Sequence, residues 1–403
     1  MKFNKLSQLF LVSILGLSVA SLLTSCAIVT IDYVYVANSA GSGTSSTGQI
    51  QTYDADSETG ALRSGAATVP SGGNNPVAIT TSSDFANLYV VNKASNNVVH
   101  FAIDGNGVLS QKDVVTTSAS PVAVAINAAG TYLYVVSGPT PAVLTAYSIS
   151  GGAIGSAVAT IPLTLPGYPL DVVVPTGVNV LTNNGAVYVS TYDQSAYNPG
   201  GTTTSSANPG WVFGYAVGSG GVLGAATGSP YKAGVKPSAL ISDPTNRFVY
   251  VTDFASNEII GYTIQGGSTL NFLINGPFKT GNEPNSIAID PRGKYIYISN
   301  GLDSTVSAYV IDLTTGTPSS AVNATGSQTN ATDTTPVAVV VDPALGRFVY
   351  TANSLGDSIS GFRLNADTGA LQPTQSTPYP TGASPAALAA VPHGNHSIQT
   401  TSP

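Results

Sequence analysis

The 403-residue sequence has little charge and few of the residues that carry most catalytic and cofactor chemistry. Only 8% of its residues are charged, and it contains one Cys, one Met, one Trp and three His. A single Cys excludes a disulfide framework, a metal site built from cysteines and a haem-attachment motif. Because hydrophobic residues make up 42% of the chain, a chain that is disordered throughout is excluded as well.

Basic residues are scarce too. Lys and Arg number 13 against 20 Asp and Glu, which gives a formal net charge of −7. Nucleic acid phosphates and anionic lipid headgroups repel such a surface, so we expect no nucleic-acid partner. No cofactor motif is present, and we expect no cofactor.

The N-terminus has the order of a secretory signal. Lys2 and Lys5 precede an apolar stretch, Leu9 to Leu23, which is followed at once by "LTSC" ending at Cys26. The apolar stretch is too short, and too closely followed by polar sequence, for a membrane span.

The end of this signal resembles a bacterial lipobox. The resemblance implies that residues 1–25 are removed and that Cys26 becomes the lipidated first residue of the mature chain. Residues 26–32 are then a tether, and attachment to the membrane rests on the acyl chains. Because Ala27 rather than Asp follows the Cys, we expect a bacterial cell-envelope protein anchored in the outer membrane.

Four kinds of short segment recur along the chain. One kind begins with Pro and alternates apolar residues; it starts at Pro76, Pro121, Pro169, Pro237, Pro284, Pro336 and Pro385. A second is centred on a tyrosine: Tyr35, Tyr89, Tyr134, Tyr188, Tyr250, Tyr297 and Tyr350. A third ends in an aromatic residue, and a fourth follows a Gly turn such as "TGALR". Four short strands per unit, seven times over, predict an all-β fold, a seven-bladed β-propeller of four antiparallel strands per blade over residues 33–391.

The Pro at the start of each first strand has a physical explanation. It begins the innermost strand, where its missing N–H removes no ladder hydrogen bond. Blades are narrowest at the axis, and the residue two positions after each Pro is small in six of seven units, Asp171 being the exception. The tyrosine of the second strand is expected to pack against the next blade and to bring its hydroxyl to a polar partner.

The two chain ends predict how the ring closes. The first unit enters at its second strand, and the last ends after a lone Pro strand at Pro385. The C-terminal strand should therefore complete the blade that the N-terminus begins, which protects both edges. Residues 392–403 show no pattern and are expected to be a disordered tail. A ring that is closed by its own C-terminal strand gives no reason to expect a dimer, so we expect a monomer.

Two stretches, "GSPYKAGVKPSALISDPTNRFVYVTDFASNEIIGYTI" and "NGPFKTGNEPNSIAIDPRGKYIYISNGLDSTVSAYVID", resemble the lactonase family of seven-bladed propellers. That family includes 6-phosphogluconolactonase-like proteins, and the stretches are also similar to YVTN-repeat surface propellers. The resemblance implies hydrolysis of a sugar lactone near the mouth of the central channel by His, Arg and Glu side chains.

The chain departs from that chemistry. His100 falls within a third strand, and the other two His lie in the tail motif "HGNH". Arg247, Arg292 and Arg347 sit at first-to-second-strand turns, on the face opposite the loops that usually bind ligands. No catalytic residue is therefore carried over from the family.

The mouth of a propeller is built by the loop that enters each first strand and by the loop after each second strand. Glu283, Lys236 and Asp253 come to it from neighbouring units, and a carboxylate beside an ammonium can activate water against a lactone carbonyl. Amides at second-strand ends can steady the oxyanion or bind a ligand; they are Asn92, Asn300 and Asn353. The alternative interpretation is that the Asn and Asp residues only satisfy turn backbone groups.

Two further features face the same mouth. Asp171 would lie near the axis as a ligand or proton acceptor, or would tie down its atypical unit, with Tyr168 just before the Pro of that unit. The longest insertion, Thr191 to Trp211, carries Tyr192 and ends at the only Trp. It is a lid, a recognition loop or a disordered segment.

The histidines suggest structure rather than catalysis. His100 is interpreted as a partly buried structural residue. His393 and His396 of "HGNH" have no carboxylates beside them in the sequence, so no metal site is expected.

Two functions remain open. One is an envelope lactonase acting on a small-molecule lactone. The other is a non-catalytic surface propeller that binds a protein or glycan partner through its loop face, favoured by the missing His and Arg set and by the Ser-, Thr- and Asn-rich loops. The sequence alone does not decide between them, because propeller repeats specify blades rather than active sites.

Overall fold

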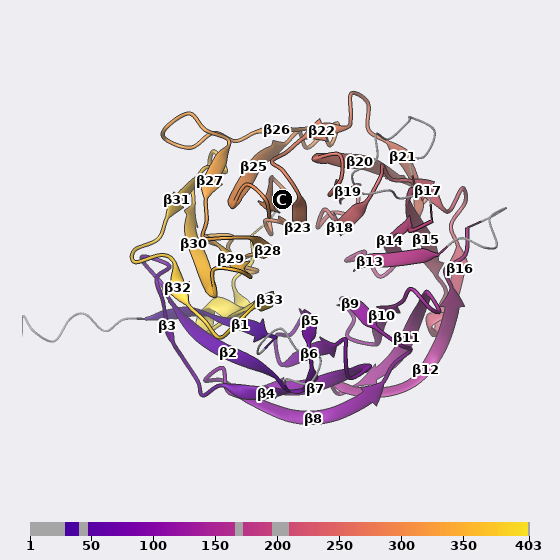
Figure 1. Cartoon of the computed structure of the whole chain (residues 1–403), viewed down its shortest axis with the longest axis horizontal. Helices are drawn as coiled ribbons and strands as arrows, with labels where there is room; N and C mark the ends of the chain where they lie inside the picture. The colour runs from indigo at the N-terminus through magenta and orange to yellow at the C-terminus, as the bar shows by residue number, and fades with distance from the viewer. Residues whose placement is uncertain (1–28, 40–46, 166–171, 196–208, 402–403) are drawn as a thin grey trace, which may run out of the picture.

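The computed structural model describes residues 29–39, 47–165, 172–195 and 209–401. Seven antiparallel sheets are arranged around a central axis (Figure 1), which confirms the predicted seven-bladed propeller. In that part of the chain no helix is long and apolar enough to cross a membrane. Cys26 lies outside the described residues.

The strands of the first four blades run outward from the axis as follows. Blade 1 holds β33 (Pro385–Pro392), β1 (Thr30–Asn38), β2 (Thr47–Asp56) and β3 (Leu62–Ser64), with β4 (Val69–Asn74) also on β2. Blade 2 holds β5 (Pro76–Thr81), β6 (Asn87–Asn92), β7 (Asn97–Ile103) and β8 (Leu109–Thr116). Blade 3 holds β9 (Pro121–Ile126), β10 (Tyr132–Ser137), β11 (Val143–Ser150) and β12 (Ala153–Pro162). Blade 4 holds β13 (Val173–Val180), β14 (Ala186–Asp193), β15 (Gly210–Val217) and β16 (Leu223–Ala225), with β17 (Tyr231–Lys232) also on β15.

The remaining three blades follow the same order. Blade 5 holds β18 (Pro237–Ser242), β19 (Phe248–Asp253), β20 (Glu258–Gln265) and β21 (Thr269–Phe272), with β22 (Phe278–Lys279) on β20. Blade 6 holds β23 (Pro284–Ile289), β24 (Tyr295–Asn300), β25 (Thr305–Ile311) and β26 (Pro318–Ser320), with β27 (Thr329–Ala331) on β25. Blade 7 holds β28 (Pro336–Val341), β29 (Phe348–Asn353), β30 (Ser358–Leu364) and β31 (Leu371–Pro373), with β32 (Tyr379–Pro380) on β30. Two short 3-10 helices are η1 (Ser219–Gly221) and η2 (Gly394–Ile398).

The strand register corrects one sequence prediction. In the regular blades the first-strand Pro faces the last residue of the second strand, as Pro237 faces Asp253. In blade 4 the residue in that position is Pro175, opposite Thr191, and the following small residue is Gly177. The prediction that Pro169 begins this strand, with Asp171 in the small position, is therefore wrong. Both segments of blade 4 begin with a Pro and continue with apolar residues, so only pairing with β14 fixes the register.

All seven innermost strands thus have a small residue two positions after the Pro. The set is Ala78, Ala123, Gly177, Ala239, Ser286, Ala338 and Ala387. Asp171 itself lies outside the described residues.

The seven second-strand tyrosines are fully buried between blades. Six donate their hydroxyl to a main-chain carbonyl in the third-to-fourth-strand turn of the next blade: Tyr35 to Gly107, Tyr89 to Gly152, Tyr188 to Ser268, Tyr250 to Gly316, Tyr297 to Gly369 and Tyr350 to Gly60. This confirms the predicted packing and polar partner. The Tyr134 hydroxyl is buried and has no hydrogen-bond partner among the described residues. Burial raises the pKa of Tyr134 to about 12.

The ring closes as predicted. Strand β1 pairs antiparallel with β33, from Asp32 opposite Pro392 to Asn38 opposite Pro385. We call this junction of the two chain ends the seam (Figure 1). The tail beyond it was expected to be disordered, but the structure folds residues 394–398 into η2, which contacts both β1 and β33.

Candidate functional site

The backbone at the mouth is held in an unusual conformation. The residue before the first-strand Pro has a positive φ in five blades: Asn75 (55°), Ser120 (52°), Glu283 (54°), Thr335 (57°) and Ser384 (52°). A side chain from the preceding blade holds this backbone; the Glu283 N–H donates to Asn257 Oδ1 at 2.9 Å, and the Ser384 N–H to Asp357 Oδ1 at 2.7 Å. Because the conformation repeats around the ring, it belongs to the architecture rather than to one active site.

Asp253 at the mouth is fully buried and holds the loop that carries Lys236. Its Oδ1 accepts the N–H of Lys236 at 2.9 Å, and its Oδ2 accepts the N–H of Val235 at 2.6 Å. Ala255 and Ser256 donate two more N–H groups to Oδ1. This is the arrangement of the alternative interpretation, in which the aspartate satisfies turn backbone groups.

The three predicted ligand-binding amides are also fully buried. The Asn300 Nδ2 donates to the hydroxyls of Thr305 and Ser307, at 3.0 and 2.9 Å. Asn353 donates in the same way to Ser358 and Ser360, both at 3.0 Å. Asn92 donates to Ser71 O and to Asn97 Oδ1. These amide hydrogens are engaged within the blade or, for Asn92, also by Ser71 of the preceding blade, so they do not form an oxyanion hole in this conformation.

Glu283 and Lys236 are the predicted mouth residues that stay partly exposed. The Lys236 ammonium lies 4.2 Å from the centroid of the Phe254 ring and 5.8 Å from that of Tyr192. An ammonium over aromatic faces is attracted by their quadrupoles. Among the described residues no ion pair joins Lys236 to Glu283.

The insertion of blade 4 is shorter than the sequence suggested. Tyr192 lies on β14 and Trp211 on β15, with Thr191 directly opposite Trp211. The Lys232 ammonium sits 3.7 Å from the centroid of the Trp211 ring. Residues 196–208, and Tyr168 with Asp171, lie outside the described residues.

His100 is a structural residue, in agreement with the sequence interpretation. It is buried, and its two ring nitrogens lie 2.9 Å from Asp113 Oδ2 and 2.8 Å from Asn87 Oδ1. Its ring stacks on Tyr89, with 5.1 Å between centroids. Both nitrogens are engaged, so His100 has no free position for catalysis.

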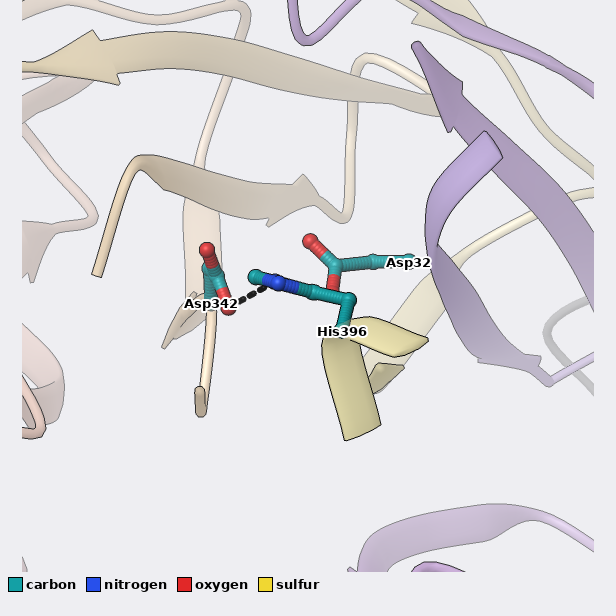
Figure 2. A group of neighbouring side chains, drawn as sticks. All are labelled: Asp32, Asp342 and His396. Carbon is teal, nitrogen blue, oxygen red and sulfur yellow. Dashed lines mark hydrogen bonds and ion pairs between the residues drawn. The ribbon is translucent and has the colours of Figure 1, made fainter. Parts of the chain in front are cut away.

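A second group of titratable side chains lies at the seam, on the face opposite the mouth. Figure 2 shows its three residues. Asp32 of β1, Asp342 after β28 and His396 of η2 bring one ligand atom each to within 4.8 Å of one another. His396 Nε2 is 3.3 Å from Asp342 Oδ1 and 3.5 Å from Asp32 Oδ1. We call these three residues the seam cluster. The sequence analysis expected no carboxylate beside the "HGNH" histidines, and the structure corrects this by bringing two to His396.

The electrostatics of the seam cluster are unusual. Burial raises the pKa of Asp32 well above its ordinary value; the Asp342 charge raises it further, and the Arg347 guanidinium opposes the rise. Burial also acts to raise the pKa of Asp342, but the hydrogen bond and charge of His396 bring it below the ordinary value. Burial acts to lower the pKa of His396, yet hydrogen bonds with Asp342 and Gln399 raise it overall.

A groove of about 1210 Å³ lies elsewhere, between the outer parts of blades 6 and 7. Three arginines line it: Arg292, Arg347 and Arg363. None of the candidate mouth residues is among its lining residues, so the groove and the mouth are separate features.

A comparison with known protein families shows to which family the chain belongs. The family described as "Lactonase, 7-bladed beta-propeller" matches residues 34–169 and 224–398. The chain belongs to this family. Lys236, Asp253 and Glu283 fall within the matched residues, as do Asp342 and His396, whereas Tyr192 and Trp211 fall in the unmatched part of blade 4.

Solved structures of lactonase-type propellers have the same fold. A putative 6-phosphogluconolactonase from Bacteroides fragilis is 19% identical, with a TM-score of 0.69 over 90% of this chain and 98% of that chain. The periplasmic gluconolactonase of Pseudomonas aeruginosa is 19% identical, with a TM-score of 0.71 over 90% of this chain and 99% of that chain. At this identity the likeness shows the fold alone. No curated protein matches the sequence.

Proposed function

We propose that the chain hydrolyses a lactone at the mouth of its central channel. The observation that carries the proposal is membership of the lactonase propeller family together with two partly exposed, oppositely charged side chains at the mouth, Glu283 and Lys236. Glu283 acts as the general base that draws a proton from the attacking water. The Lys236 ammonium stabilises the charge that develops on the carbonyl oxygen.

Asp253 has a positioning role in this proposal. It binds the backbone N–H groups of Val235 and Lys236, and so fixes the loop from which the Lys236 side chain extends. The buried amides of the second strands already donate to other groups of the protein, so in this proposal Lys236 rather than an asparagine stabilises the oxyanion.

The proposed substrate class is an uncharged sugar lactone. The neighbouring structures are named for gluconolactone and 6-phosphogluconolactone chemistry. A chain with a formal net charge of −7 repels a phosphorylated substrate at long range. A neutral lactone does not meet that barrier.

The proposed location is the bacterial envelope, with a lipid anchor at Cys26 in the outer membrane. The lipobox-like "LTSC" supports this, and one structural neighbour is a periplasmic protein. Cys26→Ala should move the protein from the membrane fraction to the soluble fraction, because the acyl chains provide the attachment. Unchanged membrane partition of the Cys26→Ala chain would contradict the anchor.

A binding function is the second candidate, and one observation favours it. Most polar groups at the mouth are already hydrogen-bonded to the protein, while Trp211 and Tyr192, both partly exposed, lie on opposite faces of the sheet at the end of blade 4. Partly exposed aromatic rings suit sugar rings and protein anchors. In this alternative the partner is a glycan or a surface protein, and the chain is not an enzyme.

The deciding experiment is a pH-stat assay of the full chain in detergent against a panel of sugar and aliphatic lactones. We expect acid release from the wild type and a fall of roughly 100-fold in Glu283→Gln, since a general base contributes at least that much. Lys236→Met, which keeps the bulk over Phe254, should lower kcat. Glu58→Gln, an exposed glutamate in the turn between β2 and β3 on the opposite face, is the matched control and should turn over normally.

Absence of turnover by the wild type on every lactone would contradict hydrolysis and favour the binding function. So would turnover that is equal in the wild type and Glu283→Gln. The binding function would then be tested by glycan-array capture with a chain that lacks residues 196–208.

A further inference from the structure

The seam cluster differs from the matching turns of blades 5 and 6, where a buried aspartate pairs with an arginine of its own turn. An aspartate ends the first strand or follows it in blades 5, 6 and 7, and each is fully buried: Asp243, Asp290 and Asp342. In blade 5 the Arg247 Nε lies 3.3 Å from Asp243, and in blade 6 the Arg292 Nε lies 2.5 Å from Asp290. In blade 7 the partner is instead His396, from the C-terminal tail.

Asp32 adds a second carboxylate at this point. It is fully buried, and neither of its oxygens has a hydrogen-bond donor among the described residues. Its neighbour across the strand pair is Pro392, which has no N–H to give. A buried carboxylate without a donor is strongly destabilising when it is ionised, and a cation bound beside it removes that cost. His396 Nε2 lies 3.5 Å from Asp32 Oδ1 and makes no hydrogen bond to it.

His396 is oriented as a ligand. Its Nδ1 lies 3.2 Å from Gln399 Oε1 and its Nε2 lies 3.3 Å from Asp342 Oδ1. A metal ion that binds here would displace the Nε2 proton, and the Nε2 lone pair would then face the two carboxylates. Asp342 is also held from behind, because the N–H groups of Ala344 and Leu345 donate to its Oδ1. Such outer hydrogen bonds commonly orient the ligands of metal ions in proteins.

The spacing of the donor atoms fits one ion. His396 Nε2 is 3.3 and 3.5 Å from the nearest oxygens of Asp342 and Asp32. Nitrogen and oxygen ligands bind Zn²⁺ at about 2.0–2.2 Å, which puts neighbouring donors of a tetrahedron roughly 3.4 Å apart. The three side chains converge from β1, the turn after β28 and η2 (Figure 2).

We propose that Asp32, Asp342 and His396 bind a divalent transition-metal ion, Zn²⁺ first among them, at the seam of the propeller. An imidazole nitrogen with two carboxylates suits Zn²⁺ better than Mg²⁺ or Ca²⁺, which prefer oxygen ligands alone. The second oxygen of Asp32, which also has no donor, is available for the fourth position. The nearby Arg347 charge leaves the cluster with one net negative charge when His396 is neutral.

The ion would connect three parts of the chain that come together only when the propeller ring closes. Asp32 comes from β1, Asp342 from blade 7 and His396 from the tail. Metal binding of this kind adds its free energy to folding. The site is separate from the mouth and does not depend on lactone hydrolysis.

The test is isothermal calorimetry on the untagged full chain in detergent, stripped of metal by a chelator and titrated with ZnCl₂. We expect one Zn²⁺ per chain, no heat with MgCl₂ and a higher melting temperature with zinc. Asp32→Asn and His396→Gln should each weaken Zn²⁺ binding by at least roughly 100-fold, because each removes a direct ligand and loss of an outer hydrogen bond alone costs up to that much. His393→Gln is the matched control, since His393 lies in the same tail and contacts Thr30 O instead.

Asp32→Asn is the sharper variant, because the contact between His396 and Asp342 remains and the tail stays docked. Equal zinc affinity in Asp32→Asn and the wild type would overturn the proposal, as would a stripped wild type that binds no zinc. If either variant fails to fold, the wild type alone decides. Crystals soaked in zinc should show an anomalous peak between the three side chains, and a peak elsewhere only would overturn the site.

Discussion

Asp253 at the mouth and Asp32 at the seam are both buried completely on second strands, yet their surroundings are opposite. Asp253 accepts four backbone N–H groups, from Val235, Lys236, Ala255 and Ser256. Asp32 accepts none from the described residues. Burial therefore does not distinguish a structural carboxylate from a ligand; the number of donors around it does.

The difference has an origin in the chain. Between β18 and β19 a turn follows Asp243, and the N–H groups of Arg247 and Phe248 donate to its carboxylate. Strands β33 and β1 come from opposite ends of the chain and have no such turn between them. The seam blade keeps the strand pairing of its neighbours but lacks the N–H donors that such a turn supplies, and neither oxygen of Asp32 has a donor among the described residues.

Replacing Asp253 should have the largest effect. Asp253→Ala leaves the N–H groups of Val235 and Lys236 without an acceptor, and we expect a loss of about 3 kcal/mol in the free energy of unfolding. Urea denaturation followed by circular dichroism measures it. Asp253→Asn keeps one acceptor oxygen and should lose less than half as much. An Asp253→Ala chain as stable as the wild type would contradict the claim that the hydrogen bonds accepted by Asp253 stabilise the fold.

Packing between blades 7 and 1, beside the seam, should match packing between the other blades. Gly60 has φ +69°, and a Cβ there would lie 2.3 Å from the Phe348 ring of blade 7. Gly60→Ala should therefore lower the free energy of unfolding by about 2–3 kcal/mol, through overpacking and the left-handed backbone. Gly151→Ala, with φ +57° and open space around its Cβ, isolates the backbone contribution of about 1 kcal/mol. Equal losses in thermal unfolding would show that the interface between blades 7 and 1 is loosely packed.

Two buried tyrosine hydroxyls offer the same comparison for uncharged groups, since one has a hydrogen-bond partner and the other does not. The Tyr350 hydroxyl of blade 7 donates to Gly60 O of blade 1 at 2.9 Å, whereas the equally buried Tyr134 hydroxyl has no partner among the described residues. Tyr350→Phe should lower the free energy of unfolding by about 1 kcal/mol, and Tyr134→Phe should leave it unchanged or raise it slightly. The reverse order in urea denaturation would mean that partner counts do not predict stability here.

The fold could be predicted from the sequence because each blade repeats its own signals. The Pro strands, the tyrosines and the Gly turns recur at every blade, so a seven-bladed ring with its ends joined followed from local patterns. Blade 4 was the exception, since Pro169 and Pro175 both begin apolar segments and pairing alone selects Pro175. Local patterning does not encode that choice.

The site could be predicted only in part. Topology placed Glu283, Lys236 and Asp253 at one mouth, but the side-chain contacts that engage Asp253 and the asparagines become visible only in three dimensions. The seam cluster was missed because Asp32 and His396 lie 364 positions apart and meet through closure of the ring. One signal was available: Asp32 stands directly before the Tyr33 segment, where the matching positions of blades 5 and 7 hold Arg247 and Arg347.

The most direct test of the account is the free energy of unfolding of the wild type and of Asp32→Asn, each with a chelator and with Zn²⁺. With the chelator, Asp32→Asn should be at least as stable as the wild type, because it removes a buried charge without donors. With Zn²⁺ at a hundredfold excess over its dissociation constant, the wild type should gain about 2.7 kcal/mol and the variant nothing. A variant that is less stable than the wild type under both conditions, by the same amount, would contradict the claim that Asp32 is a ligand.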